Sequence, residues 1–335
     1  MSLEVELKLG LTTALTQPMR QQLLDCWSQW AVQVEQQPAV SLLNAYFDTA
    51  EQWFRRHDAG LRSRCKAGRY QQTIKLAGQQ LGAAHVRPEY NQPCAGVVPQ
   101  LAAFPADIWP EHTDITALQQ QLTELFRTDF SRQIWLLTLA DGSVVEAVLD
   151  EGLVLAGGRS QDIVEIELEL VSGDAAQLFW LARQLFSKFP LCLGFQSKAE
   201  RGYRLAQQQP LTVLPCDPDA GFSQLLRALQ QNLALAAAAG AAAASLQPVL
   251  DGQWQQLQQK LKANGSAAAL ALGLAAPELQ QGAALSLWLL DFSAWLLLAT
   301  LPAPEQLPAE QSPTEQLPTE QLQAEQSTRS EQQHD

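Results

Sequence analysis

The sequence lacks the cysteine patterns that cross-link small domains or hold zinc. Its five cysteines are widely spaced, with no C-x-x-C pair and no Cys/His cluster. An odd and scattered set is typical of reduced thiols, so we expect a cytoplasmic protein. The histidines are equally scattered, and without metal-site spacing we expect them on the surface or in loops. They are His57, His85, His112 and His334.

Basic residues are also scarce. The chain has 22 Lys and Arg against 35 Asp and Glu, a net charge of −13, which argues against a general nucleic-acid binder. No G-x-x-x-x-G-K-[ST] loop is present, so any nucleotide chemistry would not be of the P-loop kind. The N-terminus leads directly into a charged segment, and we expect no signal peptide.

What the sequence does have is a segment at the N-terminus in which charged and apolar residues alternate. Glu4, Glu6 and Lys8 share one face of a predicted strand. The pattern returns in Glu165, Glu167 and Glu169. Carboxylates in a row repel one another unless water or cations screen them. For either segment alone, a solvated strand face is as good an interpretation as a metal site in a polar cavity. The rest of the chain favours the metal site.

Residues 1–205 are expected to form mostly β-structure with short helices. The predicted strands are Leu3–Leu9, Asn44–Thr49, Leu61–Cys65, Arg69–Leu76, His85–Asn91, Phe126–Leu139, Ser143–Glu151, Leu153–Ala156 and Asp162–Val171. Apolar residues at helical spacing predict helices over Gln17–Gln33 and Ala175–Phe189, and a weaker one over Ile115–Leu125. We expect these helices to cover a sheet.

Residues 218–301 change character, because alanine and leucine dominate and only helices fit. The apolar run Ala283–Leu301 is nearly long enough to span a bilayer, but Asp291 lies near its middle and no basic residues flank it. We therefore expect no stable membrane insertion, and a buried helix or a contact between copies of the chain. Residues 302–335 repeat a Glu-Gln-Pro unit every five residues, which predicts a disordered acidic tail.

Basic residues of the first 205 positions lie mostly on predicted strands. Those expected to bind an anion are Arg62, Arg64, Lys75, Arg87 and Arg132, followed by Lys198 and Arg201. Guanidinium forks match phosphate oxygens bidentately. Any single arginine is more simply explained as the ion-pair partner of a glutamate. The whole set, alternating with carboxylates, suits a barrel with a polar and wet interior.

These residues, taken in order, resemble the CYTH domain of the triphosphate tunnel metalloenzymes. The motifs are Glu4-x-Glu6-x-Lys8, Tyr46-Phe47-Asp48-Thr49, Leu61-Arg62-x-Arg64, Thr73-x-Lys75, Arg87-Pro88-Glu89-Tyr90, Glu146-x-x-x-Asp150-x-Gly152, Glu165-Ile166-Glu167-Leu168-Glu169-Leu170 and Ser197-Lys198-x-Glu200-Arg201-Gly202. The resemblance implies an α+β fold: a closed antiparallel barrel of about eight strands whose charged tunnel binds triphosphate, with flanking helices.

The resemblance also implies roles for individual residues. Those expected to hold Mg²⁺ or Mn²⁺ are Glu4, Glu6, Asp150, Glu165 and Glu167, and carboxylate oxygens are the ligands these ions prefer. Those expected to bind the phosphates are Arg62, Arg64, Lys75, Arg87 and Arg132, with Lys198 and Arg201 at one mouth. Lys8 would contact the terminal phosphate or position the attacking water, and Glu146 would lie on the far wall.

The implied activity is that of a metal-dependent inorganic triphosphatase acting on tripolyphosphate. Two alternatives are an organic triphosphate enzyme (nucleoside or thiamine triphosphatase, adenylate cyclase) and a polyphosphate-binding module without turnover. The many carboxylates argue against the module, since an anion binder gains nothing from them. Bacterial relatives carry a C-terminal helical CHAD domain rich in histidine and basic residues. Residues 218–301 have no histidine and only Arg227, Lys260 and Lys262, so we expect a truncated or degenerate CHAD-like region.

Overall fold

The computed structural model describes residues 2–278 and 282–300, so the predicted tail at 302–335 lies outside the described residues. The strands are β1 (Ser2–Leu11), β2 (Gln33–Gln36), β3 (Val40–Asp48), β4 (Gly60–Lys66), β5 (Arg69–Lys75), β6 (Gln79–Leu81), β7 (Ala84–Cys94), β8 (Thr123–Thr138), β9 (Val144–Ala156), β10 (Arg159–Ser172) and β11 (Leu191–Leu193). The helices are α1 (Gln17–Trp30), α2 (Trp53–Arg56), α3 (Ile115–Gln120), α4 (Ala176–Phe186), α5 (Lys198–Gln207), α6 (Phe222–Ala239), α7 (Gln247–Asn264), α8 (Ala267–Leu274) and α9 (Gly282–Thr300).

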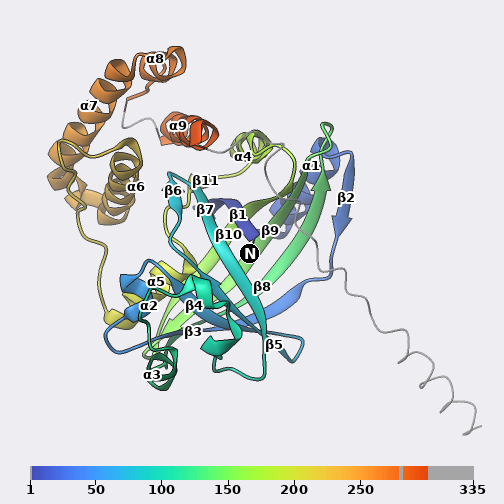
Figure 1. Cartoon of the computed structure of the whole chain (residues 1–335). Coiled ribbons are helices and arrows are strands. Elements are labelled where there is room, and N and C mark those ends of the chain that lie inside the picture. The colour runs from blue at the N-terminus through green and yellow to red at the C-terminus, as the bar shows by residue number, and fades with distance from the viewer. Residues whose placement is uncertain (1, 279–281, 301–335) are drawn as a thin grey trace, which may run out of the picture.

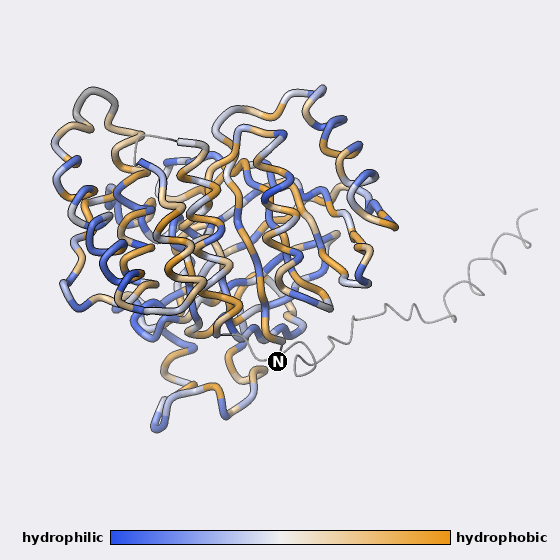
Figure 2. Tube along the Cα trace, turned by 90° about the horizontal axis from the view of Figure 1, so that it is seen from above, coloured by the Kyte–Doolittle hydropathy of each residue, from blue (hydrophilic) through white to orange (hydrophobic). Residues whose placement is uncertain are grey.

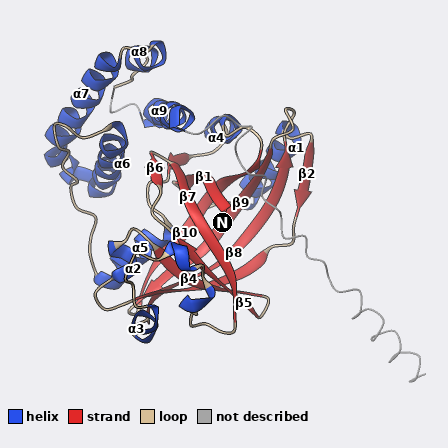
Figure 3. Ribbon diagram, in the orientation of Figure 1, coloured by secondary structure: helices blue, strands red, loops and turns tan. Residues whose placement is uncertain are grey.

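Eight of the strands close into a barrel. The order around the ring is β1, β10, β9, β8, β3, β4, β5 and β7, and β7 pairs back with β1. Neighbours in the ring are antiparallel throughout (Figure 3). The short strands β2, β6 and β11 extend the sheet beside β8, β7 and β1. The expectation of a closed antiparallel barrel with flanking helices is confirmed.

The barrel is polar inside and apolar outside. On β1 the buried side chains of Glu4, Glu6 and Lys8 face the interior, whereas Val5 and Leu7 belong to the main hydrophobic core. That core lies between the outer barrel wall and the helices that cover it. Along the extended traces of the sheet, hydrophobic and hydrophilic residues alternate (Figure 2). Both faces of β1 are therefore buried, one against the charged side chains inside the barrel and one against apolar helices.

Helices α6 and α9 pack on the end of the barrel that carries β6, β11 and α4, and α7 and α8 pack on these two helices (Figure 1). Leu226 of α6 and Phe292 of α9 belong to the same core cluster as Leu7 of β1, so the helical region and the barrel share one core. The turn between β6 and β7 fits closely against this region, because a Cβ on Gly82 would lie 2.0 Å from the Ser293 hydroxyl. Within the described part of the chain, no helix has the length and hydropathy that a bilayer crossing needs.

Several local predictions are wrong. The two strands predicted on either side of Gly152 are one strand, β9. Gly152 marks a close approach of neighbouring strands and not a turn, since its Cβ would lie 2.2 Å from the Asp129 carbonyl oxygen. The third helix ends at Gln120, before the long strand β8 begins. His85 is not a surface residue: it lies on β7 opposite Glu6 and is buried.

Candidate functional site

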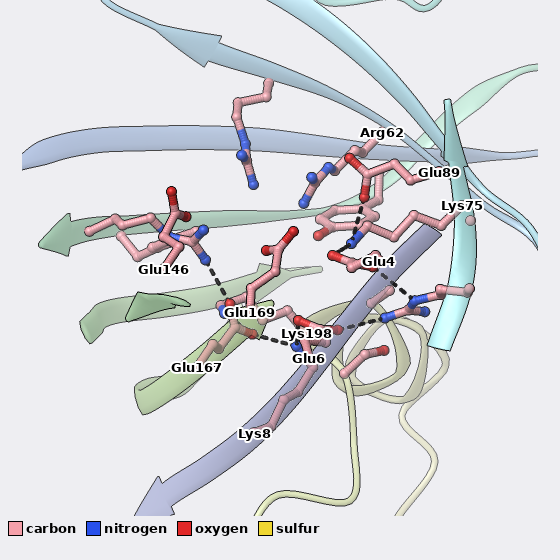
Figure 4. A pocket seen from close by; sticks show the side chains of 18 residues that line it. Glu4, Glu6, Lys8, Arg62, Lys75, Glu89, Glu146, Glu167, Glu169 and Lys198 are labelled. Atoms are coloured by element: carbon pink, nitrogen blue, oxygen red, sulfur yellow. Dashed lines mark hydrogen bonds and ion pairs between the residues drawn. The ribbon is translucent and has the colours of Figure 1, made fainter. Parts of the chain in front are cut away.

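The barrel interior holds a charged cavity of about 190 Å³. Its walls come from seven of the ring strands (β1, β3, β4, β5, β7, β8 and β10), with Glu146 from β9 and the first residues of α5. Figure 4 shows its glutamate, lysine and arginine side chains pointing toward one another from opposite walls. The period of two along each strand explains this arrangement, because every second residue of a closed antiparallel barrel faces inward.

The row on β1 is held by cations from β7 and β5. Glu4 pairs with Lys75 and lies 3.4 Å from the Arg87 guanidinium. Glu6 lies 2.7 Å from the Lys8 ammonium and 3.3 Å from Arg87. Burial alone would raise the pKa of Glu6, but Lys8 and its neighbouring cations hold it well below the usual range. Glu6 is therefore ionised at neutral pH.

A second cluster surrounds the Lys198 ammonium. It lies 2.6 Å from Asp150 and 3.1 Å from Glu167, and it also pairs with Glu165. Ligand oxygens of these three buried acids lie within 4.8 Å of one another, a spacing that suits a metal ion. In the structure the ammonium pairs with all three acids. Burial would lower the pKa of Lys198, but these carboxylates hold it above its ordinary value.

Arg132 and Lys8 complete this cluster. Arg132 binds Asp150 bidentately at 2.8 and 2.7 Å and reaches Glu167 at 2.7 Å. Lys8 lies 2.5 Å from Glu167. Burial would lower the pKa of Lys8, but Glu167 and Glu6 raise it above its ordinary value, so this lysine stays protonated. Two predicted residues lie at the edge: Glu165 and Arg201, 3.2 Å apart, line a neighbouring pocket of about 420 Å³.

Two arginines of the cavity have no carboxylate partner. Among the described residues, neither Arg62 nor Arg64 of β4 forms an ion pair, although both line the cavity. The Arg64 Nε donates to the Asn44 side-chain oxygen at 2.8 Å, and the buried Arg62 Nε has no partner. Burial and repulsion from Arg62 and Arg132 lower the pKa of Arg64 to about 9. Uncompensated guanidiniums of this kind form a receptor for an anion.

Two carboxylates, Glu169 and Glu146, are left without a cation in the same way in the described part of the chain, and Glu6 lies in register with them. Glu6 on β1, Glu169 on β10 and Glu146 on β9 lie directly opposite one another across the sheet. Like charges at this spacing destabilise a sheet. Burial and repulsion from Glu4, Glu6 and Glu146 hold the pKa of Glu169 well above its usual range, and burial raises that of Glu146. Among the described residues, Glu169 and Glu146 form no ion pair.

This row fits the divalent cation that the sequence predicts, because a hard cation would relieve the repulsion among its carboxylates. The alternation of charges predicts Glu169 in the acidic row, but Glu169 is not among the metal ligands expected from the sequence. The signal was available, since Glu169 continues the same alternation by one step. The predicted ligands Asp150, Glu165 and Glu167 also have a spacing that suits a metal ion, and in the structure they pair with protein cations, as Glu4 and Glu6 do.

Comparison with known proteins bears on this geometry. Residues 2–203 match the CYTH domain family. An inorganic triphosphatase of Haemophilus influenzae is 32% identical over 210 residues, which are 62% of this chain and 56% of the relative. The chain thus spans little more than half the length of that curated relative.

Solved structures with a similar fold share little sequence. A Hippeastrum protein assigned as an adenylyl cyclase and described as having a dominant triphosphatase activity is 18% identical, with a TM-score of 0.41 over 62% of this chain and 97% of that one. A protein of Pyrococcus horikoshii is 15% identical, with a TM-score of 0.37 over 60% of this chain and 99% of that one. Similarity at this level carries no information about activity.

Proposed function

The chain belongs to the CYTH domain family, and from that premise we propose that it is a metal-dependent inorganic triphosphatase. It hydrolyses tripolyphosphate to pyrophosphate and phosphate inside the barrel. One observation supports this more than any other: uncompensated guanidiniums and uncompensated carboxylates face the same buried cavity. A polyanion neutralises the first set and a divalent cation neutralises the second, so together they describe a metal–triphosphate complex.

Phosphoryl transfer depends mainly on positioning and charge neutralisation. Among the described residues, Arg62 and Arg64 pair with no carboxylate, so in this proposal they bind the phosphate oxygens. Three other cations, Lys75, Arg132 and Lys198, pair with carboxylates, and each would also form ion pairs with the phosphates of the substrate. Arg87 binds Glu4 and Glu6, and in this proposal it orients those carboxylates.

The attacking water adds to the terminal phosphorus, its proton passes to a carboxylate, and the bond to the bridging oxygen breaks to release pyrophosphate. Lys8 is protonated, so it stabilises the charge that develops on the terminal phosphate and does not act as the base. Glu146, whose pKa is raised by burial, is suited to accept the proton. Mg²⁺ or Mn²⁺, held by Glu4, Glu6 and Glu169, would neutralise phosphate charge.

The test is phosphate release from tripolyphosphate with Mg²⁺ or Mn²⁺, measured beside ATP and pyrophosphate, with Glu4→Ala as control. We expect release from tripolyphosphate, lost in the variant while tripolyphosphate still binds. Preference for ATP would instead support an organic triphosphate enzyme. Binding with no release from any of the three, by a folded protein with either metal, would leave only a binding module.

A further inference from the structure

Arg227 of α6 connects the helical region to the loop that enters the tunnel. Its guanidinium donates to the Phe195 carbonyl oxygen and to the Gln80 side-chain oxygen, each at 2.5 Å, and it pairs with Glu200 in the first turn of α5. The guanidinium carbon also lies 5.5 Å from the centre of the Phe195 ring. Four contacts therefore converge on one half-buried side chain.

The loop that Arg227 holds leads directly to Lys198. Ser197 caps α5 by accepting from the Glu200 amide at 3.1 Å, and Lys198 is the first residue of the helix. Residues two apart on a helix point to nearly opposite sides, since each step turns about 100°. Lys198 therefore reaches into the tunnel while Glu200 faces outward to Arg227.

The remainder of α5 is already fixed by the barrel. The Tyr203 hydroxyl donates to Asp48 at 2.7 Å, and Gly202 lies so close to Phe126 that a Cβ would be 2.0 Å from the ring. These contacts hold the second turn of the helix. The first turn is held on its tunnel side by Lys198 and Arg201, which pair with barrel carboxylates. The loop before it is held by the Gly194 amide, which donates to the Lys8 carbonyl oxygen at 2.8 Å, and by Gln80, which donates to the Phe195 carbonyl oxygen at 2.7 Å. Arg227 adds its contacts from the outer side.

We propose that Arg227 is a positioning residue for the triphosphate site: it holds residues 195–200 from outside so that the Lys198 ammonium keeps its place in the tunnel. The expected effect on turnover rests on the proposed function. The positioning of residues 195–200 by Arg227 does not depend on it. The helical region is then part of the working site and not an appended module, because one of its three basic residues sets the position of a tunnel cation.

The chain offers a matched control. Arg183 of α4 pairs with Asp291 of α9 and so also joins the barrel cover to the helical region, but its side chain is 47% exposed and makes this one ion pair. The side chain of Arg227 is 22% exposed. Methionine at either position keeps much of the apolar stem and removes the charge.

The experiment is a double-mutant cycle between Arg227→Met and Lys198→Met, read as kcat/KM for tripolyphosphate in the full chain. A misplacement of about 1 Å costs up to about 100-fold in rate, so we expect Arg227→Met alone to lower kcat/KM about tenfold or more. In the Lys198→Met background the same change should cost less than about twofold. Arg183→Met should stay within about twofold of the parent, and Arg227→Lys should recover part of the loss.

A second measurement decides the inference even if tripolyphosphate is not the substrate. Hydrogen exchange of residues 195–201 should accelerate in Arg227→Met and stay unchanged in Arg183→Met, with no ligand present. Equal exchange in the two variants would overturn the proposal. So would a loss of turnover that is as large without Lys198 as with it, since a merely structural arginine would give additive effects.

Discussion

Replacing Glu169 with glutamine should stabilise the metal-free protein and weaken its response to metal. Glu169 faces Glu6 and Glu146 directly across two strand pairs, and no cation pairs with it among the described residues. Each opposed like-charge pair costs up to about 1 kcal/mol. Because the pKa of Glu169 is raised, folding at pH 8 must either keep this charge against its neighbours or protonate the carboxyl, and glutamine removes either cost while it keeps the shape. We therefore expect the free energy of unfolding to rise by about 1–2 kcal/mol without metal at pH 8.

The assay is thermal unfolding in the presence of a chelator and again with Mn²⁺ or Mg²⁺. For a barrel of this size, about 1–2 kcal/mol corresponds to a Tm increase of roughly 3–6 °C. Metal at about 100 times its Kd should stabilise the parent by about 2.7 kcal/mol and the variant by much less. The order of stability should therefore reverse when metal is added.

The control is Glu35→Gln, the same change on the exposed strand β2, which should alter stability by less than about 0.5 kcal/mol in either condition. A Glu169→Gln variant that is less stable than the parent in chelator would refute the reasoning, because it would mean that this carboxylate makes favourable contacts without metal. An equal response of both proteins to metal would remove Glu169 from the site.

Three further outcomes are expected. Arg64→Ala should weaken tripolyphosphate binding by about 10- to 100-fold in calorimetry, because it removes charge-assisted hydrogen bonds worth about 1.5–3 kcal/mol; the exposed Arg69→Ala should change it little. Burial lowers the pKa of His85 to about 3, so the folded protein keeps this imidazole neutral while the unfolded chain protonates it below the ordinary pKa of 6.5. The free energy of unfolding therefore falls as pH drops below 6.5. Between pH 7 and pH 5, the free energy of unfolding measured by urea titration should fall by about 2 kcal/mol less in His85→Gln than in the parent. Gly82→Ala should destabilise by about 1–3 kcal/mol in thermal melts, since Gly82 has φ +70° and its Cβ would overlap Ser293; no change would mean that the helical region does not dock on this turn.

The barrel strands could be predicted from the sequence because the alternation of charged and apolar residues is a local pattern within each strand. A period of two over β1 and β10 places carboxylates on one face of each strand, and the structure puts both faces inside. The same local rule wrongly predicted a turn at Gly152. The glycine there allows neighbouring strands to approach closely. The rule also missed α5, whose start is set by the Ser197 cap and by contacts with distant strands.

Charge compensation within the tunnel could not be predicted in this way. Whether a glutamate is neutralised depends on which strand lies across from it. Glu167 faces Lys8 and Arg132, whereas Glu169, two positions later, faces Glu6 and Glu146. The burial of His85 has the same origin, since only the pairing of β7 with β1 places it opposite Glu6. These environments depend on the register between strands that are far apart in the sequence. The sequence of one strand alone does not show this register.

The closure of the ring through β1 has a consequence for synthesis on the ribosome. Glu6 lies between His85 of β7 and Glu169 of β10, so β1 is synthesised well before the two strands that it pairs with in the ring. Contacts between residues so far apart slow folding, and an unpaired strand edge invites association with other chains. The edge of β1 that pairs with β10 therefore stays without this partner until β10 has left the ribosomal exit tunnel. Conditions that slow translation across residues 11–159 should prolong its exposure to chaperones.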